Sequence, residues 1–134
     1  MTNSDLDIMA RTIFGEARGE EFDGKLAVAH VILNRVEKRH RKEVTIAGVC
    51  TEPYQFSCWL PDDPNRPKME AITVDQPVFR DCLMAALKAI AQGDDEDMTL
   101  GSTHYHTTAI SPAWAEGKDP VVTIGQHAFY NDID

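Results

Sequence analysis

The chain has 134 residues, 43% of them hydrophobic, and a formal net charge of -9 at pH 7. This length predicts one domain, residues 1–134, with enough apolar side chains to bury a core. The acidic balance argues against nucleic acid binding, which needs a basic face to displace counterions from phosphate. It also argues against stable association with an anionic membrane surface. We therefore expect a single compact domain that binds neither nucleic acid nor membrane.

Two features favour a protein that is made as a soluble cytoplasmic chain. The N-terminal segment MTNSDLDIMARTIF carries acids where a secretory signal has lysine or arginine, and no apolar stretch is long enough to span a bilayer. The three cysteines are odd in number and lack the short paired spacing of a zinc ribbon or a redox motif. We expect reduced, mostly buried thiols at Cys50, Cys58 and Cys82.

Hydrophobic spacing predicts two helices in the first third of the chain. Apolar residues recur at helical intervals over Asp5–Ala17, which predicts the first helix. Residues 26–36 are apolar almost all round, a pattern typical of a buried central helix. The basic run RVEKRHRK, residues 35–42, follows, and we interpret it as the solvated end of that helix.

The remainder of the chain is less regular. Glycine and proline punctuate residues 44–73, which predicts mostly loop there. Pro77 near the start and Gly93 at the end bracket a third, amphipathic helix. The tail that follows is rich in threonine, histidine, glycine and aromatic residues and has room for short strands. Together these patterns predict a mainly helical α+β domain whose polar and aromatic loops face one side.

The stretch TIFGEARGEE, residues 12–21, gathers three carboxylates around a glycine turn. Glu16 lies at the end of the first predicted helix beside apolar Phe14, and both the helix dipole and the apolar surroundings disfavour the charged form. A glutamate in its acid form can protonate a poor leaving group such as a glycosidic oxygen. Glu20 is either a second functional acid or a surface residue, and we interpret Glu21 as a surface acid.

Five blocks along the chain resemble one known family. In order, they are TIFGEARGE, GKLAVAHVILNRV, IAGVCTEPYQFSCW, THYHTTAISPAWA and IGQHAFY. They resemble the cell-wall hydrolase family typified by the spore-cortex-lytic enzyme SleB and its relative CwlJ, and the match covers nearly the whole chain. The resemblance implies a compact, lysozyme-like catalytic domain similar to goose-type lysozymes and lytic transglycosylases.

The resemblance also implies a reaction. Enzymes of this kind cut peptidoglycan glycan strands between N-acetylmuramic acid and N-acetylglucosamine, and the first acid of GEARGE, here Glu16, is the dominant catalytic residue. In a lytic transglycosylase Glu16 serves as acid and then as base, so neither a second carboxylate nor a cofactor is needed. In an inverting hydrolase a second acid about 6.5–9.5 Å away activates water, and Glu20 is the nearest candidate.

The loop block YQFSCW fits glycan recognition, because a sugar offers both hydroxyls and an apolar face. We expect Gln55, the leading candidate, and Ser57 to hydrogen-bond the sugar. Phe56 and Trp59 either cover a sugar ring or pin the loop onto the core; both readings stay open. Tyr105 resembles a position near the family's cleft that helps to place the acetamido group or the intermediate.

Three histidines suggest a different chemistry. His104, His106 and His127 form an H-x-H pair plus a later histidine, which can close a zinc site with an open position for water. Glu16 would then be the base of a zinc-dependent amidase or peptidase. Without metal, we count His104 among the substrate contacts. A third possibility is a glycan-binding module that does not cut, for which the aromatic loop would suffice.

The sequence departs from the SleB pattern in two respects. Spore enzymes of that type carry a signal peptide and a separate wall-binding domain, and neither is recognisable in this sequence. We therefore expect a monomeric phage or prophage endolysin that waits in the cytoplasm until a holin opens the inner membrane, or a wall-cutting part of a virion.

Overall fold

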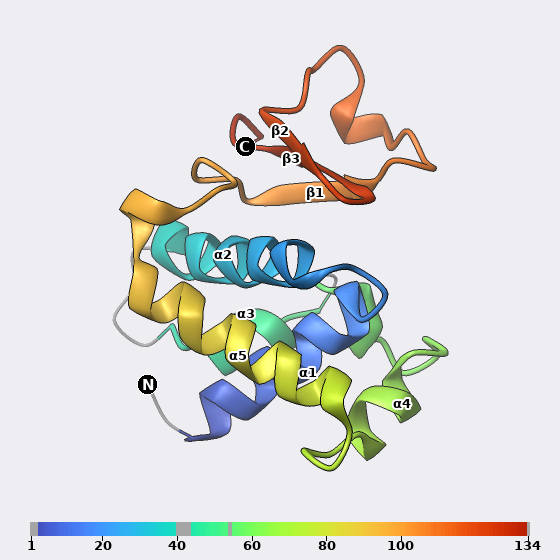
Figure 1. Cartoon of the computed structure of the whole chain (residues 1–134). Helices are drawn as coiled ribbons and strands as arrows, with labels where there is room; N and C mark the ends of the chain where they lie inside the picture. Colours follow the sequence, from blue (N-terminus) through green and yellow to red (C-terminus); the bar gives the residue numbers. More distant parts are fainter. Residues whose placement is uncertain (1–2, 40–43, 54, 134) are drawn as a thin grey trace.

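The computed structural model describes residues 3–39, 44–53 and 55–133, and helices dominate this part of the chain (Figure 1). The helices are α1 (Asn3–Ala17), α2 (Phe22–Arg39), α3 (Ile46–Thr51), α4 (Arg66–Ala71) and α5 (Pro77–Gln92). The strands are β1 (His104–Thr107), β2 (Val122–Ile124) and β3 (His127–Tyr130), and short 3-10 turns cover Ser57–Trp59, Asp94–Glu96 and Ala113–Ala115. None of the described helices combines the length and the apolar character needed to cross a membrane.

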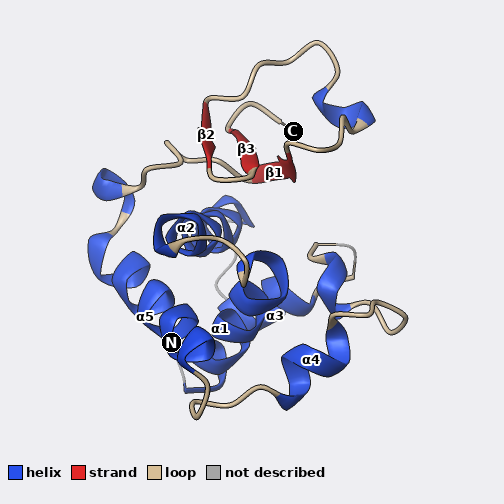
Figure 2. Ribbon diagram, turned by 45° about the vertical axis from the view of Figure 1, so that its right-hand side comes forward, coloured by secondary structure: helices blue, strands red, loops and turns tan. Residues whose placement is uncertain are grey.

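Helix α2 lies at the centre of the molecule, as its nearly uniform apolar pattern predicts. Its residues 24–32 are all buried. Helices α1 and α5 pack against one side of α2, and the sheet lies across the opposite side (Figures 1 and 2). This arrangement leaves the C-terminal end of α1 near the sheet, where the two can build a site together.

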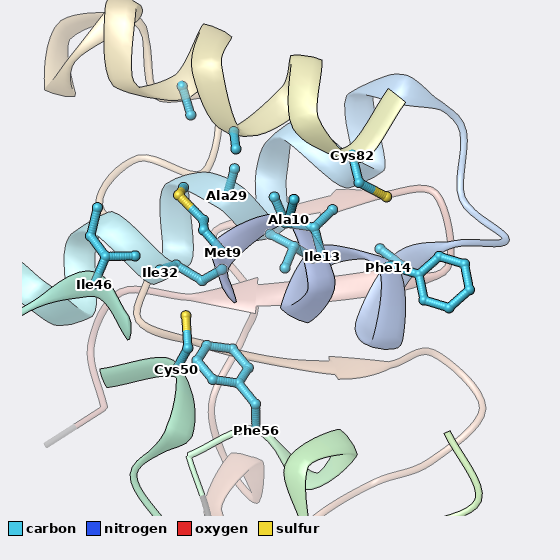
Figure 3. Packing of buried hydrophobic residues seen from close by; sticks show 14 of the residues in the cluster. Met9, Ala10, Ile13, Phe14, Ala29, Ile32, Ile46, Cys50, Phe56 and Cys82 are labelled. Carbon is cyan, nitrogen blue, oxygen red and sulfur yellow. The ribbon is translucent and has the colours of Figure 1, made fainter. Parts of the chain in front are cut away.

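The main core joins α1, α2, α3 and α5 (Figure 3). Each large side chain in it is removed from water, which stabilises the fold by about 1.5–3 kcal/mol per residue relative to exposure. The labelled members are Met9, Ala10, Ile13, Phe14, Ala29, Ile32, Ile46, Cys50, Phe56 and Cys82. All three cysteines are free and buried, as predicted from their number and spacing.

The prediction that residues 44–73 are mostly loop was wrong in part, because this segment contains α3 and α4. Thr45 caps α3, since its side-chain oxygen accepts a hydrogen bond of 2.9 Å from the backbone N–H of Gly48. Pro67 lies in the first turn of α4, where the missing N–H would have no intrahelical partner. Proline therefore marks a helix start here as well as a loop.

The strands form an antiparallel sheet in the order β1-β3-β2. Tyr105 of β1 and Val122 of β2 both pair with Phe129 of β3, so these three side chains share one face. That face packs on Ala27 and Val31 of α2. Side chains of the alternate residues of β1 and β3 point away from α2. The short strands expected in the tail are thus present, and their register decides which tail residues can reach the end of α1.

Candidate active site

The last turn of α1 and the middle of β1 bring Glu16 and Tyr105 together. The Tyr105 hydroxyl donates a hydrogen bond of 2.5 Å to Oε1 of Glu16. Burial raises the pKa of Tyr105 well above its usual value, and the carboxylate charge and hydrogen bond of Glu16 raise it further. The hydroxyl therefore keeps its proton near neutral pH and remains a donor to Glu16.

Glu16 and Tyr105 open onto a cavity of about 450 Å³. Its lining is mostly polar, and it comes from α1, α2, the loop after α3, β1 and the 3-10 turn before β2. The lining residues are Glu16, Arg35, Gln55, Ser57, His104, Tyr105 and Trp114. Among the residues that the structure describes, Glu16 supplies the carboxylate of this lining. The cavity thus combines one acid with several hydrogen-bonding groups and an aromatic wall.

Arg35 lines this cavity and ties two neighbouring segments together, a role that the basic run did not indicate. Its Nε donates to the carbonyl of Thr103 at 2.6 Å and its Nη1 donates to the carbonyl of Gln55 at 2.7 Å. Its guanidinium also lies 4.4 Å from the centre of the Phe56 ring. Burial lowers the pKa of Arg35, and the groups of Tyr105 and Glu16 oppose that effect. Our interpretation of the basic run as solvated was therefore wrong for its first residue.

The predicted glycan-binding loop divides into residues that line the cavity and residues that do not. Gln55 and Ser57 line it, and Oε1 of Gln55 accepts a hydrogen bond of 3.0 Å from Arg39. Phe56 is 2% exposed and belongs to the core, while Nε1 of Trp59 donates to Thr12 at 2.9 Å. Both aromatic side chains pin the loop onto the core, which is the second of the two readings. Tyr54 lies outside the described residues.

Glu20 faces a different part of the molecule. It lies between α1 and α2, and its Oε1 accepts a hydrogen bond of 2.8 Å from the backbone N–H of Gln126 in the β2–β3 turn. The same oxygen is 3.3 Å from Nδ1 of His127. Glu20 lines a separate cavity together with Gly125. The structure therefore does not bring Glu20 into the cavity of Glu16, and Glu21 is exposed.

The sheet register separates the three histidines of the zinc hypothesis. His104 and His106 are two apart on β1 and share a face, whereas His127 pairs with Thr107 and so points to the opposite face. No group of three potential metal ligands is found among residues 3–39, 44–53 and 55–133. His106 instead contacts the Tyr130 hydroxyl through Nε2 at 2.9 Å. The three-histidine site was therefore a wrong reading of the spacing.

Trp114 forms the outer wall of the cavity, and the sequence analysis did not select it. It is 37% exposed and packs edge-on against His104, with ring centroids 5.3 Å apart. It also contacts the rings of His106 and Tyr130. Trp114 occurs in a polar, proline-containing loop, SPAWAEG, where few apolar neighbours are available to bury it. That position in the sequence could have indicated an exposed tryptophan that binds a ligand.

Asn34 is a buried polar residue on α2 whose hydrogen bonds tie the helix to the segment before β1. Its Nδ2 donates to Oδ2 of Asp97 at 2.8 Å and to the carbonyl of Ser102 at 2.9 Å. Asp97 in turn accepts hydrogen bonds from the backbone and side chain of Thr99. This network ties α2 to the segment that leads into β1.

The domain is mainly helical with a small antiparallel sheet, and it shares the lysozyme-like, lytic-transglycosylase-like fold of SleB catalytic domains. The chain belongs to the cell wall hydrolase family, whose model matches residues 19–130. Glu16 lies just ahead of the matched range, so its role is inferred from the cavity. The family and the fold class predicted from the sequence blocks are both confirmed.

Relatives and solved structures agree with this membership. The chain is 32% identical to the spore cortex-lytic enzyme of Bacillus subtilis and 43% identical to that of Bacillus cereus, with 96% of this chain covered in each case. It spans 38% and 44% of the length of these relatives. The catalytic domain of the Bacillus cereus SleB protein is 29% identical, with a TM-score of 0.73 over 96% of this chain and 91% of that one. The catalytic domain of the germination-specific lytic transglycosylase SleB from Bacillus anthracis is also 29% identical, with a TM-score of 0.72 over 96% of this chain and 95% of that one.

Proposed function

We propose that this chain is a lytic transglycosylase that cleaves the peptidoglycan glycan strand between N-acetylmuramic acid and N-acetylglucosamine. The names of its relatives support the substrate class, since they include spore cortex-lytic enzymes and a germination-specific lytic transglycosylase. The proposal rests mainly on the cavity. Among its described lining residues Glu16 supplies the carboxylate, and this carboxylate accepts a hydrogen bond from Tyr105.

A cavity with one carboxylate favours transglycosylation over inverting hydrolysis. An inverting glycosidase needs a second carboxylate about 6.5–9.5 Å from the acid, with room for a water between them. Glu20, the nearest candidate in sequence, points into another cavity. Transglycosylation needs no second carboxylate, because the nucleophile is a hydroxyl of the muramyl residue itself.

In the proposed reaction Glu16 acts twice. As an acid it gives its proton to the glycosidic oxygen, the bond between that oxygen and muramyl C1 breaks, and N-acetylglucosamine leaves with a free 4-hydroxyl. As a carboxylate it then takes the proton of the muramyl 6-hydroxyl while that oxygen bonds to C1, which gives a 1,6-anhydro sugar and restores the acid. Tyr105 donates to Oε1 of Glu16, so one carboxyl oxygen is held in place while the proton is transferred.

The neighbouring groups suit the second half of the cycle and the binding of the substrate. The hydrogen bond from Tyr105 and the positive charge of Arg35 favour the carboxylate that forms after the first proton transfer. The side chains of Gln55, Ser57 and His104 offer hydrogen-bonding groups for sugar hydroxyls and the acetamido group. Trp114 offers an exposed aromatic surface for the apolar face of a sugar ring.

Substitution of Glu16 tests the assignment and separates an enzyme from a binding module. Glu16→Gln keeps the size of the side chain and its acceptor for Tyr105, but it removes the acid proton and the base. We expect glycan cleavage to fall to background while the variant still sediments with purified peptidoglycan as the wild type does. A wild type that binds but releases no glycan fragments would favour the binding module, and an active Glu16→Gln variant would overturn the site.

The expectations of a phage or prophage origin, a monomeric state and release through a holin stay predictions. They are tested apart from the chemistry. Detection of the protein outside growing cells without lysis would contradict the holin route, and a dimer in sedimentation would contradict the monomer.

A further inference from the structure

Buried His127 and partly buried Glu20 form a pair next to Tyr105. His127 is 5% exposed, and the Glu20 side chain is 12% exposed. Oε1 of Glu20 lies 3.3 Å from Nδ1 of His127. Among the described residues, no group makes an aligned hydrogen bond to this nitrogen, so the Glu20 carboxylate is its electrostatic partner. The pair lies outside the lining of the Glu16 cavity, and the proposed reaction gives it no role.

The backbone around Glu20 is built to hold its carboxylate in this place. A Cβ on Gly125 would lie 2.6 Å from Oε1 of Glu20, and a Cβ on Gly24 would lie 2.7 Å from its Cβ. Gly125 also has a φ of +58°, a conformation that favours glycine. The backbone N–H of Gln126 donates to Oε1, and the ammonium group of Lys25 donates to the Glu20 carbonyl. The carboxylate is thus held close to the β2–β3 turn by a hydrogen bond and by the absence of side chains at Gly24 and Gly125.

His127 contacts the Tyr105 ring directly. The two rings meet edge to face, with centroids 5.0 Å apart and planes at 72°. Phe129 packs against Tyr105 on the same face of the sheet, with their ring centroids 5.5 Å apart. The Tyr105 hydroxyl then donates to Glu16. A continuous line of contacts thus runs from Glu20 through His127 and Tyr105 to the proposed acid.

We propose that Glu20 and His127 are positioning residues that hold Tyr105 against the Glu16 carboxyl. Glu20 acts through two aromatic rings, not as a second acid on the substrate. Its carboxylate favours the His127 tautomer that carries the proton on Nδ1, because at 3.3 Å from Oε1 the positive end of an N–H is attracted and a lone pair is repelled. The inference rests on the proposed function, since its effect on the reaction passes through Glu16.

A double-mutant cycle of Glu20 and Tyr105 tests this coupling. On purified glycan chains, Glu20→Gln should lower kcat roughly tenfold with little change in KM, because Tyr105 loses its orientation while the glycan cavity is intact. In a Tyr105→Phe background the same substitution should change kcat by less than about twofold, since the hydroxyl it positions is already absent. Glu21→Gln, at the adjacent exposed acid, is the matched control and should behave as the wild type.

Several outcomes would overturn the inference. If Glu20→Gln lowers kcat equally in both backgrounds, Glu20 acts independently of Tyr105. If Glu20→Gln has the wild-type kcat, the pair does not position anything. If the wild type itself releases no glycan fragments, the proposed function fails instead, so the two failures are distinguishable.

The wild-type protein allows a second measurement that does not depend on whether the variants fold. The ¹⁵N chemical shifts of the His127 ring at neutral pH should report a neutral imidazole with its proton on Nδ1. A proton on Nε2 alone would contradict the role given to the Glu20 carboxylate.

Discussion

The hydroxyl of Tyr105 donates a hydrogen bond of 2.5 Å to Oε1 of Glu16, although the two residues are 89 positions apart. Glu16 is at the end of α1 and Tyr105 is on β1, and both elements reach this point because they pack on α2. The proposed acid thus gains the hydrogen bond from Tyr105 only when the helices and the sheet have docked.

Tyr105→Phe should lower kcat about 10-fold to 100-fold. The substitution removes the donor to Glu16, and a hydrogen bond to a charged group contributes about 1.5–3 kcal/mol. The ring remains, so its contacts with His127 and Phe129 persist and the near-ultraviolet circular dichroism should change little. Release of soluble glycan fragments measures the effect, and wild-type turnover in this variant would refute the role given to the hydroxyl.

Arg35→Lys should destabilise the fold by about 1–3 kcal/mol and reduce activity. The guanidinium donates to the carbonyls of Thr103 and Gln55 at once, and the single ammonium group of a lysine cannot reproduce both hydrogen bonds. Urea unfolding measures the loss. Arg80→Lys is the control, because exposed Arg80 bonds one carbonyl, that of Val74, and its replacement should stay within about 0.5 kcal/mol of the wild type. Equal stability of the two variants would contradict the bracing role.

Gly15→Ala should destabilise the protein by about 1–3 kcal/mol, although alanine is the better helix former. A Cβ at Gly15 would lie 2.6 Å from Sδ of Met69 and 2.9 Å from Cβ of Cys58, and both neighbours are buried. The comparison is Gly19→Ala, since a Cβ there meets nothing within 4 Å. Urea midpoints in which Gly15→Ala equals or exceeds the wild type would show that the neighbours can move aside.

Stability should fall as the pH drops below about 6.5, the ordinary pKa of histidine. Burial lowers the pKa of His127, and the charges of Glu20 and Glu16 oppose that effect only in part. A depressed histidine pKa means that the unfolded chain binds more protons in this range, so acid favours unfolding. The contribution of His127 to the free energy of unfolding is complete above the pKa of histidine in the unfolded chain. It is lost as the pH falls toward the lower pKa of His127 in the folded protein.

Burial also lowers the pKa of His104, and the charges of Arg35 and Lys38 act in the same direction. Both histidines therefore contribute to the loss of stability below about pH 6.5. Thermal unfolding between about pH 5 and pH 8 measures the slope. His127→Gln should flatten it in part, and an unchanged slope in that variant would contradict the assignment to His127.

The sequence predicts the helices well where the helical spacing of apolar residues continues over many residues. The first helix was expected at Asp5–Ala17 and spans Asn3–Ala17, and the third was expected from Pro77 to Gly93 and spans Pro77–Gln92. The short helices α3 and α4 were missed because six residues are too few to show a period. Their starts were nevertheless visible in Thr45 and Pro67.

The site was harder to predict, because its pairs depend on docking and not on spacing. Glu16, Gln55, Ser57, His104 and Tyr105 were candidates that line one cavity. Arg35 looked like part of a solvated basic run because a sequence does not say which side of a helix meets a loop. The separation of Glu16 from Glu20 follows from the turn after α1, whose direction the spacing of the two acids does not fix.

If Glu16 serves as both acid and base of a transglycosylation, the reaction products show it most directly. Purified peptidoglycan is digested with the wild-type protein, and the soluble fragments are treated with borohydride and analysed by mass spectrometry. We predict 1,6-anhydro-muramyl ends that resist reduction, with none formed by Glu16→Gln. Muramic acid ends that borohydride reduces would mean that water is the nucleophile, which would contradict the account.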